Sequence, residues 1–146
     1  MSINRKALKR DTPNIVIFRG DGLRLVVPVS DCSGDPVDIS GAQDIQFAVA
    51  KTQDDTAIFT KVLGDGIAKS NPSTFIVTID GADSALLTET VYWPEYQAAT
   101  QNKIDNRSIR GSYYYEARII IDDGTPYTVI SGRLFARESL IEGASL

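Results

Sequence analysis

The sequence predicts an all-β fold whose strands form a single antiparallel β-sandwich. Runs rich in β-branched and aromatic residues recur along the chain, and clusters of Gly, Pro, Asp, Asn and Ser separate them. Within each run apolar and polar residues alternate, as expected for strands that bury one face. Only one short stretch has the composition of a helix. The chain of 146 residues is long enough for one domain with an ordinary core.

The stretch 111–138 gives the clearest prediction, which is a β-hairpin. Its two arms flank five turn-forming residues at 122–126. A period of two places one set of residues on a dry face: Tyr115, Ala117, Ile119 and Ile121 in the first arm, and Ile130, Gly132, Leu134 and Ala136 in the second. The wet face carries Glu116, Arg118, Ser131, Arg133 and Arg137. Because the dry face must be buried, we expect a second sheet to cover it.

Five further strands are predicted before the hairpin, at 15–18, 23–29, 45–49, 58–63 and 75–79. Pro28 cannot donate a ladder hydrogen bond, so the strand 23–29 should lie at an edge or end there. The stretch 82–87 is the one predicted helix, and Asp83 lies early in it, where a carboxylate is favoured. About seven strands at this spacing indicate an immunoglobulin-like sandwich over 15–138.

The segment 91–110 breaks this pattern. It has no strand period and is longer than loops within compact domains usually are. It carries five candidate interface residues: Tyr92, Trp93, Tyr96, Arg107 and Arg110. Trp, Tyr and Arg dominate the binding energy of protein interfaces, so the segment is a candidate contact surface. The alternative is that Tyr92 and Trp93 fold back and cap one end of the sandwich.

The ends of the chain differ from the predicted domain. Residues 1–14 form a basic arm with four candidate contact residues, Arg5, Lys6, Lys9 and Arg10, and 139–146 form a C-terminal tail. We expect the arm to lie outside the core, either as a solvated tail or as a segment that docks on an acidic neighbouring subunit.

The composition argues against several classes of function. The net charge of −4 argues against binding to nucleic acid, which needs clustered Lys and Arg. No apolar run is long enough for a signal peptide or a membrane span, so we expect no membrane partner. The single cysteine, Cys32, cannot form an intrachain disulfide, in keeping with synthesis in a cytoplasm.

The residues recommend no catalytic chemistry either. The chain has no histidine, which removes the commonest hydrolytic and zinc sites. Carboxylates cluster at 31–38, 54–55, 80–83 and 122–123, but Asp beside Gly is the usual composition of turns in β-proteins. The tripeptide Arg19-Gly20-Asp21 lies at a junction between strands, where glycine permits a chain reversal. We therefore expect no enzyme activity, metal or cofactor.

Several stretches together resemble small β-sandwich domains of tailed bacteriophages. They are 17–29, 33–42, the strand with Phe47, 75–80, 83–87, 111–119 and 132–134. The similarity is to the amino-terminal domain of baseplate upper proteins and to attachment domains of tail fibres and neck appendages. In that family the Arg-Gly-Asp tripeptide is common at this position without an adhesive role. The segment 91–110 departs from the family, which has a tight turn there.

The resemblance implies a non-enzymatic virion protein, made in the host cytoplasm and located in the tail or neck. It would dock on other virion proteins and organise fibres or tail components, usually as a trimer or ring. The chain stops at the docking domain, which favours an adaptor over a whole fibre. The alternative from another class is a carbohydrate-binding module for host surface polysaccharide, with Tyr92, Trp93 and Tyr96 as a stacking platform.

Overall fold

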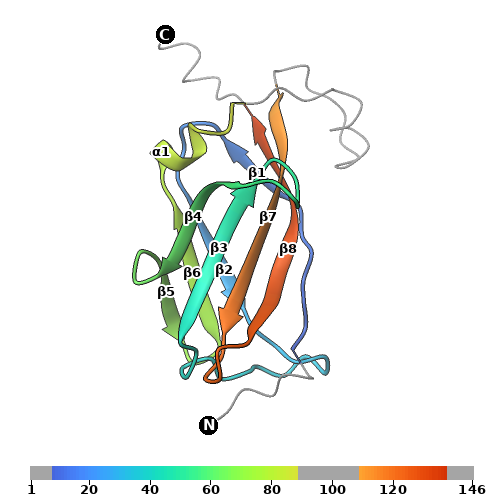
Figure 1. Ribbon diagram of the computed structural model, residues 1–146, viewed down its shortest axis with the longest axis vertical. Helices are drawn as coiled ribbons and strands as arrows, with labels where there is room; N and C mark the ends of the chain where they lie inside the picture. Colours follow the sequence, from blue (N-terminus) through green and yellow to red (C-terminus); the bar gives the residue numbers. More distant parts are fainter. Residues whose placement is uncertain (1–7, 89–108, 138–146) are drawn as a thin grey trace.

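The computed structural model describes residues 8–88 and 109–137 (Figure 1). These residues form eight strands and one short helix: β1 (Ile15–Phe18), β2 (Leu23–Pro28), β3 (Asp44–Ala50), β4 (Ala57–Leu63), β5 (Gly66–Asn71), β6 (Thr74–Ile79), α1 (Gly81–Ser84), β7 (Ile109–Ile120) and β8 (Pro126–Arg137). The prediction of an all-β fold is confirmed.

The strands pair in one continuous order, β1-β8-β7-β3-β4-β5-β6-β2. The two ends of this order, β1 and β2, are joined by only four residues, 19–22, so the sheet curls back on itself. Figure 1 accordingly shows β3, β7 and β8 in front of β2 and β6. The dry face of the β7–β8 hairpin is thus covered by strands of the same sheet, and not by a separate second sheet.

The prediction of antiparallel pairing is wrong at two places, because β1–β8 and β4–β5 pair in parallel. The described residues contain eight strands, where the sequence predicted about seven. The parallel pairing of β1 follows from the curl of the sheet, which brings the first strand beside the last one. The β4–β5 ladder has only two residue pairs, Val62–Gly66 and Leu63–Ile67, because the chain bends sharply between these strands.

The hairpin of β7 and β8 has the predicted faces, except that Ser131 on the predicted wet face is buried. The side chains of Tyr115, Ala117, Ile119 and Leu134 are buried, whereas Arg118 and Arg133 on the opposite face are exposed. The turn closes through a hydrogen bond from the Ile121 N–H to the Thr125 carbonyl oxygen, 3.1 Å long. β7 begins at Ile109, so the last two residues of the predicted loop 91–110 belong to a strand.

Strand β5 was not predicted, because its sequence Gly-Ile-Ala-Lys-Ser-Asn has few residues that favour strands. Only Ile67 is fully buried in it. Its antiparallel ladder with β6, in which Ile67 lies opposite Val77, holds it in the sheet. Tertiary pairing here outweighs local preference.

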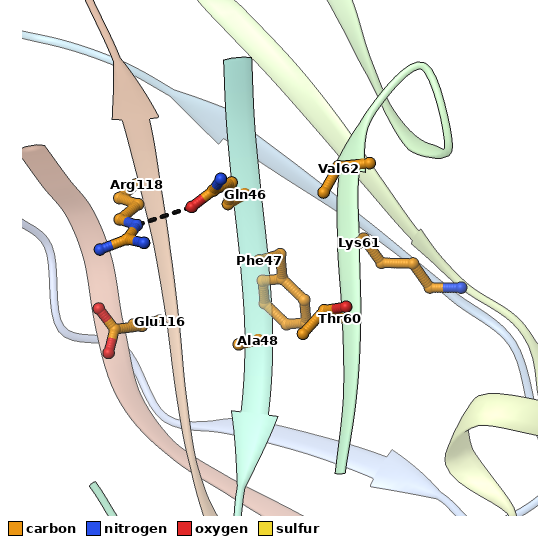
Figure 2. A pocket seen from close by; sticks show the side chains of 8 residues that line it. All are labelled: Gln46, Phe47, Ala48, Thr60, Lys61, Val62, Glu116 and Arg118. Atoms are coloured by element: carbon orange, nitrogen blue, oxygen red, sulfur yellow. Dashed lines mark hydrogen bonds between the residues drawn. The ribbon is translucent and has the colours of Figure 1, made fainter. Parts of the chain in front are cut away.

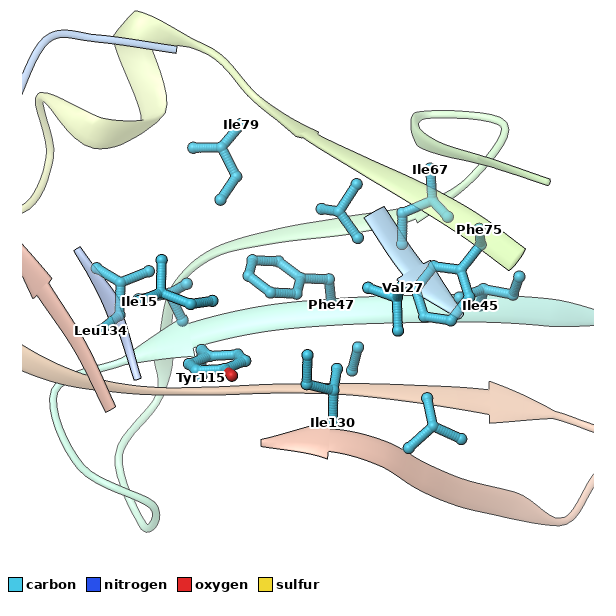
Figure 3. Packing of buried hydrophobic residues seen from close by; sticks show 14 of the residues in the cluster. Ile15, Val27, Ile45, Phe47, Ile67, Phe75, Ile79, Tyr115, Ile130 and Leu134 are labelled. Carbon is cyan, nitrogen blue, oxygen red and sulfur yellow. The ribbon is translucent and has the colours of Figure 1, made fainter. Parts of the chain in front are cut away.

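A single core fills the inside of the curled sheet (Figure 3). Phe47 lies near its centre, with its ring centroid 6.0 Å from that of Tyr115 and 6.4 Å from that of Phe59. Side chains from all eight strands contribute, among them Ile15, Val27, Phe59, Ile67, Phe75, Ile130 and Leu134. Burial of these apolar side chains is the main force that holds the fold together.

The described part of the N-terminal arm is attached to the sheet. The Lys9 N–H donates to the Ser30 carbonyl oxygen, and the Asp11 N–H and carbonyl oxygen bond to β8, each at 3.0 Å. The Tyr115 hydroxyl donates to the Pro13 carbonyl oxygen at 2.6 Å. From Leu8 onward the chain therefore differs from the expected arm outside the core.

The short helix α1 fastens the turn between β1 and β2. Ser84 is fully buried, and its Oγ accepts from the Gly20 N–H at 2.9 Å and donates to the Asp21 carbonyl oxygen at 2.8 Å. Asp80 caps the helix in a capping box with Asp83, which lies in the first turn as predicted. The helix is shorter than the predicted 82–87, since only Gly81–Ser84 are helical.

Candidate interaction surfaces

Most of the predicted interface residues lie outside the described residues. These are Tyr92, Trp93, Tyr96, Arg107, Arg5 and Lys6. Arg110 belongs to β7 by its backbone, but its side chain is not described. Lys9 and Arg10 are both exposed, and the Lys9 ammonium lies 3.6 Å from the Asp11 carboxylate.

The outer face of β1 and β8 carries a set of aromatic, arginine and apolar side chains that we call the arginine–aromatic patch. It consists of Val16, Phe18, Arg133, Phe135 and Arg137. Val16 pairs with Phe135 and Phe18 pairs with Arg137 in the parallel ladder, so these four side chains share one face. Val16 and Phe18 remain 42% and 37% exposed, although most large apolar side chains of the described residues are covered.

Cation–π contacts order this patch. The guanidinium carbon of Arg137 lies 5.6 Å from the centre of the Phe18 ring, and that of Arg133 lies 5.7 Å from the centre of the Phe135 ring. Arg133 also donates a hydrogen bond to the Ser112 hydroxyl. Phe135 is fully buried although it points away from the core. The apolar surface that the patch exposes therefore comes from Val16 and Phe18, and the guanidinium of Arg137 lies beside it.

A second feature is a groove on the outer face of β7, β3 and β4, with a volume of about 390 Å³ (Figure 2). Two rows of side chains border it. Val62, Gln46 and Arg118 form one row, and Thr60, Ala48 and Glu116 form the other. The small side chain of Ala48 lies between Thr60 and Glu116, which leaves the groove hollow there. We call this set the outer-face groove.

A chain of hydrogen bonds fixes the guanidinium at the groove. Arg118 Nε donates to Gln46 Oε1 at 2.8 Å, and Gln46 Nε2 donates to Asp44 Oδ2 at 3.1 Å. Glu116 accepts a longer hydrogen bond of 3.5 Å from Thr128. Within residues 8–88 and 109–137, Arg118 and Glu116 form no ion pair with each other. The groove can therefore offer a positioned cation and a carboxylate to a polar ligand.

The edge of β4 beside the groove is anchored from the inner side. Lys61 Nζ lies 2.6 Å from Asp83 Oδ2, and both side chains are largely buried. Burial alone would raise the pKa of Asp83, but the hydrogen bonds from Lys61 and from the Asp80 N–H outweigh it and lower the pKa below its usual value. Figure 2 shows the Lys61 side chain pointing away from Arg118 and Glu116.

Other sequence features take no part in these surfaces. The tripeptide Arg19-Gly20-Asp21 forms a turn in which the Asp21 N–H bonds to the Phe18 carbonyl oxygen and Gly20 has a φ of 91°. Cys32 is an exposed free thiol. The described part of the chain holds no group of three or more His, Cys, Asp or Glu residues placed to bind a metal. No described helix is long and apolar enough to cross a membrane.

Sequence reasoning placed the right residues on the outer face but did not identify either surface. The period of two assigned Glu116, Arg118, Arg133 and Arg137 to the wet face. The period of two does not predict which strands lie side by side. Val16 lies opposite Phe135, and Gln46 lies opposite Arg118, only because strands far apart in the sequence pair with each other. Exposed apolar residues in the first strand, Val16 and Phe18, were the signal available in the sequence.

Comparison with known proteins adds little to this description. No family model matches this chain, and no curated protein matches it. Among solved structures, murine CRIg is similar, with 14% sequence identity, coverage of 90% of this chain and 96% of that chain, and a TM-score of 0.37. A likeness this low carries no inference about fold or function.

Proposed function

We propose that this protein is a non-enzymatic structural protein of a tailed-bacteriophage virion. It acts as an adaptor of the tail, baseplate or neck that docks and organises fibres or other components through protein contacts. The sequence resemblance supplies the class, and the arginine–aromatic patch is the observation that supports a docking role. Its partly exposed aromatic residue, Phe18, lies beside the Arg137 guanidinium, and aromatic and arginine side chains are enriched in interface hot spots.

The architecture belongs to this proposal too. We propose that the curled sheet is an immunoglobulin-like sandwich, with β1, β8, β7, β3 and β4 in one layer and β5, β6 and β2 in the other. In support, among the described strands the only ladder between the two layers consists of the two residue pairs of β4 and β5. Both layers contribute side chains to one core, as the inner faces of a sandwich do.

The docking role is tested with Phe18→Asp. The change places a carboxylate in the patch and removes the partly exposed Phe18 ring, which contacts Arg137. We expect incorporation of the protein into phage particles to fall at least tenfold, measured by complementation of a phage that lacks the gene. The matched control is Val26→Asp, because Val26 is also an exposed apolar residue, at 59%, on the far edge strand β2.

Thermal unfolding of both variants should show that each still folds. Normal incorporation of a folded Phe18→Asp variant would reject the patch as the docking surface.

The proposed trimer or ring is tested separately by light scattering of the purified protein over a range of concentrations. Trp93→Ala and Arg107→Ala test whether residues 91–110 contribute to the same assembly.

The alternative function, carbohydrate binding, gains support from one observation, the outer-face groove. Its volume lies in the range of small-ligand sites, and Arg118, Glu116, Gln46 and Thr60 supply hydrogen-bonding groups. Calorimetric titration with host surface polysaccharides decides the matter. Heat of binding that Arg118→Ala abolishes would favour this alternative, and no heat across a wide panel would reject it.

A further inference from the structure

The outer-face groove holds a cation that the protein positions without neutralising it. Arg118 is exposed, and its Nε donates to Gln46 Oε1 at 2.8 Å. The two terminal nitrogens of its guanidinium form no hydrogen bond or ion pair with any residue in 8–88 or 109–137. A guanidinium binds a carboxylate best through two parallel hydrogen bonds, so these two nitrogens are suited to hold the carboxylate of a ligand.

Gln46 fixes the guanidinium in this position. Its Nε2 donates to Asp44 Oδ2 at 3.1 Å, so the side-chain amide lies between a carboxylate and a guanidinium, with a donor toward the first and an acceptor toward the second. The Asp44 carboxylate is itself anchored, because its Oδ1 accepts from the Ile45 N–H at 2.9 Å and from the Leu63 N–H at 3.3 Å. The backbone of β3 and β4 therefore holds Arg118 in place through two side chains.

The rest of the groove offers groups that bind hydroxyls. Glu116 Oε2 accepts from the Thr128 hydroxyl at 3.5 Å, and within the described ranges its Oε1 accepts no hydrogen bond. Thr60 is exposed on the opposite border, and Ala48 leaves the space between them open. Figure 2 shows Arg118 and Glu116 on the β7 side of the groove and Thr60 on the β4 side. A ligand above Ala48 can thus place one group at the guanidinium and others at the carboxylate and the threonine hydroxyl.

We propose that the outer-face groove binds an acidic saccharide, whose sugar residues carry carboxylates as uronic acids do. This inference rests on carbohydrate binding, the alternative function described above, and names the chemical class of its ligand. The ligand carboxylate accepts two hydrogen bonds from the terminal nitrogens of Arg118. The ring hydroxyls beside that carboxylate donate to Glu116 and form hydrogen bonds with the Thr60 hydroxyl.

The lining of the groove favours an acidic sugar over a neutral one. Small-ligand sites are usually lined mainly by apolar and aromatic side chains. Phe47 is the one aromatic residue among the described residues that line this groove, and it is only 1% exposed, so it offers no ring face for stacking. Hydrogen bonds between charged groups are roughly twice as strong as those between neutral groups. The pair of guanidinium and carboxylate therefore supplies the affinity that stacking does not.

Glu116 favours a saccharide over an acidic peptide. A peptide with several adjacent carboxylates would bring one of them close to Glu116, where like charges repel. A uronic acid has a single carboxylate on each ring, and its other polar groups are mostly hydroxyls, which can donate to a carboxylate. A cation and a carboxylate at one groove thus complement a ring that carries one acid group and several hydroxyls.

Calorimetric titration of the unmodified full chain tests the proposal. The probes are short oligomers of galacturonate, glucuronate and mannuronate, together with their methyl esters, which keep the hydroxyls but lose the negative charge. At least one acid oligomer should bind, and it should bind at least tenfold more tightly than its own methyl ester. A glutamate oligomer is the peptide probe, and it should bind at least tenfold more weakly than the best uronate.

A matched set of variants locates the binding. Arg118→Lys keeps the charge but loses the forked geometry and the contact of Nε with Gln46, so the affinity for the best uronate should fall at least tenfold. Arg118→Ala should abolish the heat of binding. The control is Arg24→Ala, which removes the same charge from an exposed arginine on β2, at the end of the strand order. It should leave the affinity unchanged within about twofold, because exposed charges at a distance are screened.

Four results would overturn the proposal: no binding of any uronate oligomer, methyl esters that bind as tightly as the acids, tighter binding of the glutamate oligomer, or an affinity that a folded Arg118→Lys variant retains. Thermal unfolding shows whether each variant folds, and the comparison of acids with esters needs no variant.

The outcomes also separate this inference from the functions on which it builds. If neutral polysaccharides or esters bind as well as the acids, carbohydrate binding stands and only the acidic ligand is rejected. If no saccharide binds, both are rejected. Particle incorporation with Phe18→Asp reports on the docking role independently of either result.

Discussion

The hydroxyl of Tyr115 connects the hairpin to the segment before β1. It donates to the Pro13 carbonyl oxygen at 2.6 Å, and that carbonyl also lies over Gly132, where an added Cβ would come within 2.6 Å of it. Burial, followed by the nearby Asp11 carboxylate and Tyr114, raises the pKa of Tyr115 to about 12. The folded protein therefore holds this phenol protonated.

This raised pKa predicts a loss of stability at alkaline pH. A tyrosine in the unfolded chain has a pKa of about 10. The stability that the protonated Tyr115 contributes is thus fully present below about pH 10 and is lost as the pH rises through about 12. Tyr115→Phe should lower the free energy of unfolding at neutral pH by about 1–2 kcal/mol, because the Pro13 carbonyl loses its partner.

Urea unfolding between pH 7 and 12 checks this prediction. The curve of stability against pH should fall less steeply for Tyr115→Phe than for the unchanged protein. Tyr127→Phe is the matched control, because Tyr127 is only partly buried and solvent can replace its contacts. Parallel curves for Tyr115→Phe and the unchanged protein would show that another group dominates the alkaline transition.

At the level of elements, the contact between α1 and the β1–β2 turn requires glycine for a steric reason. A Cβ on Gly81 would lie 2.5 Å from the Gly20 carbonyl oxygen, which is a backbone atom and cannot move aside easily. The two segments approach this closely because Ser84 hydrogen-bonds to Gly20 and Asp21.

Gly81→Ala should therefore lower the free energy of unfolding by about 1–3 kcal/mol. Gly22→Ala is the control for the same region, since its added Cβ would meet its nearest atom at an ordinary 3.4 Å, and we expect a change of roughly 0.5 kcal/mol or less. Gly34→Ala should lower the free energy of unfolding by about 1 kcal/mol for another reason. A Cβ there would have no atom within 4 Å, but the φ of +91° is unfavourable for any residue with a side chain. Thermal or urea unfolding separates the three, and equal costs at Gly81 and Gly22 would contradict the steric argument.

The elements also show where sequence reasoning succeeds. β7 and β8 were predictable because alternation and turn residues act locally. The predicted dry face is buried, but on the predicted wet face Ser131 is buried as well, because the segment around Asp11 bonds to β8 there. β5 was not predictable, because Ala68, Lys69 and Ser70 have no strong preference for a strand and only pairing with β6 fixes them. The capping box fixes the start of α1, but the helix ends at Ser84, and Ala85 and Leu86, which the prediction included, lie in a turn after it.

On the scale of the whole molecule, the sequence predicted the class of fold but not its closure. Nothing local in Ile15–Phe18 indicates that this strand pairs in parallel with β8, at the other end of the described chain. The same limit applies to the candidate sites. The arginine–aromatic patch and the outer-face groove both depend on strands brought together over long sequence distances, so composition alone could not define them.

The parallel ladder between β1 and β8 also constrains the order in which the molecule acquires its structure. Ile15 cannot meet Leu134 until nearly the whole described chain has been synthesised. At a translation rate of roughly 5–20 residues per second, β1 therefore waits on the order of ten seconds for its partner. During that interval its apolar side chains are available to chaperones. Refolding in the test tube should likewise be slow, in the range of milliseconds to seconds, because non-local pairings of this kind dominate the contact order.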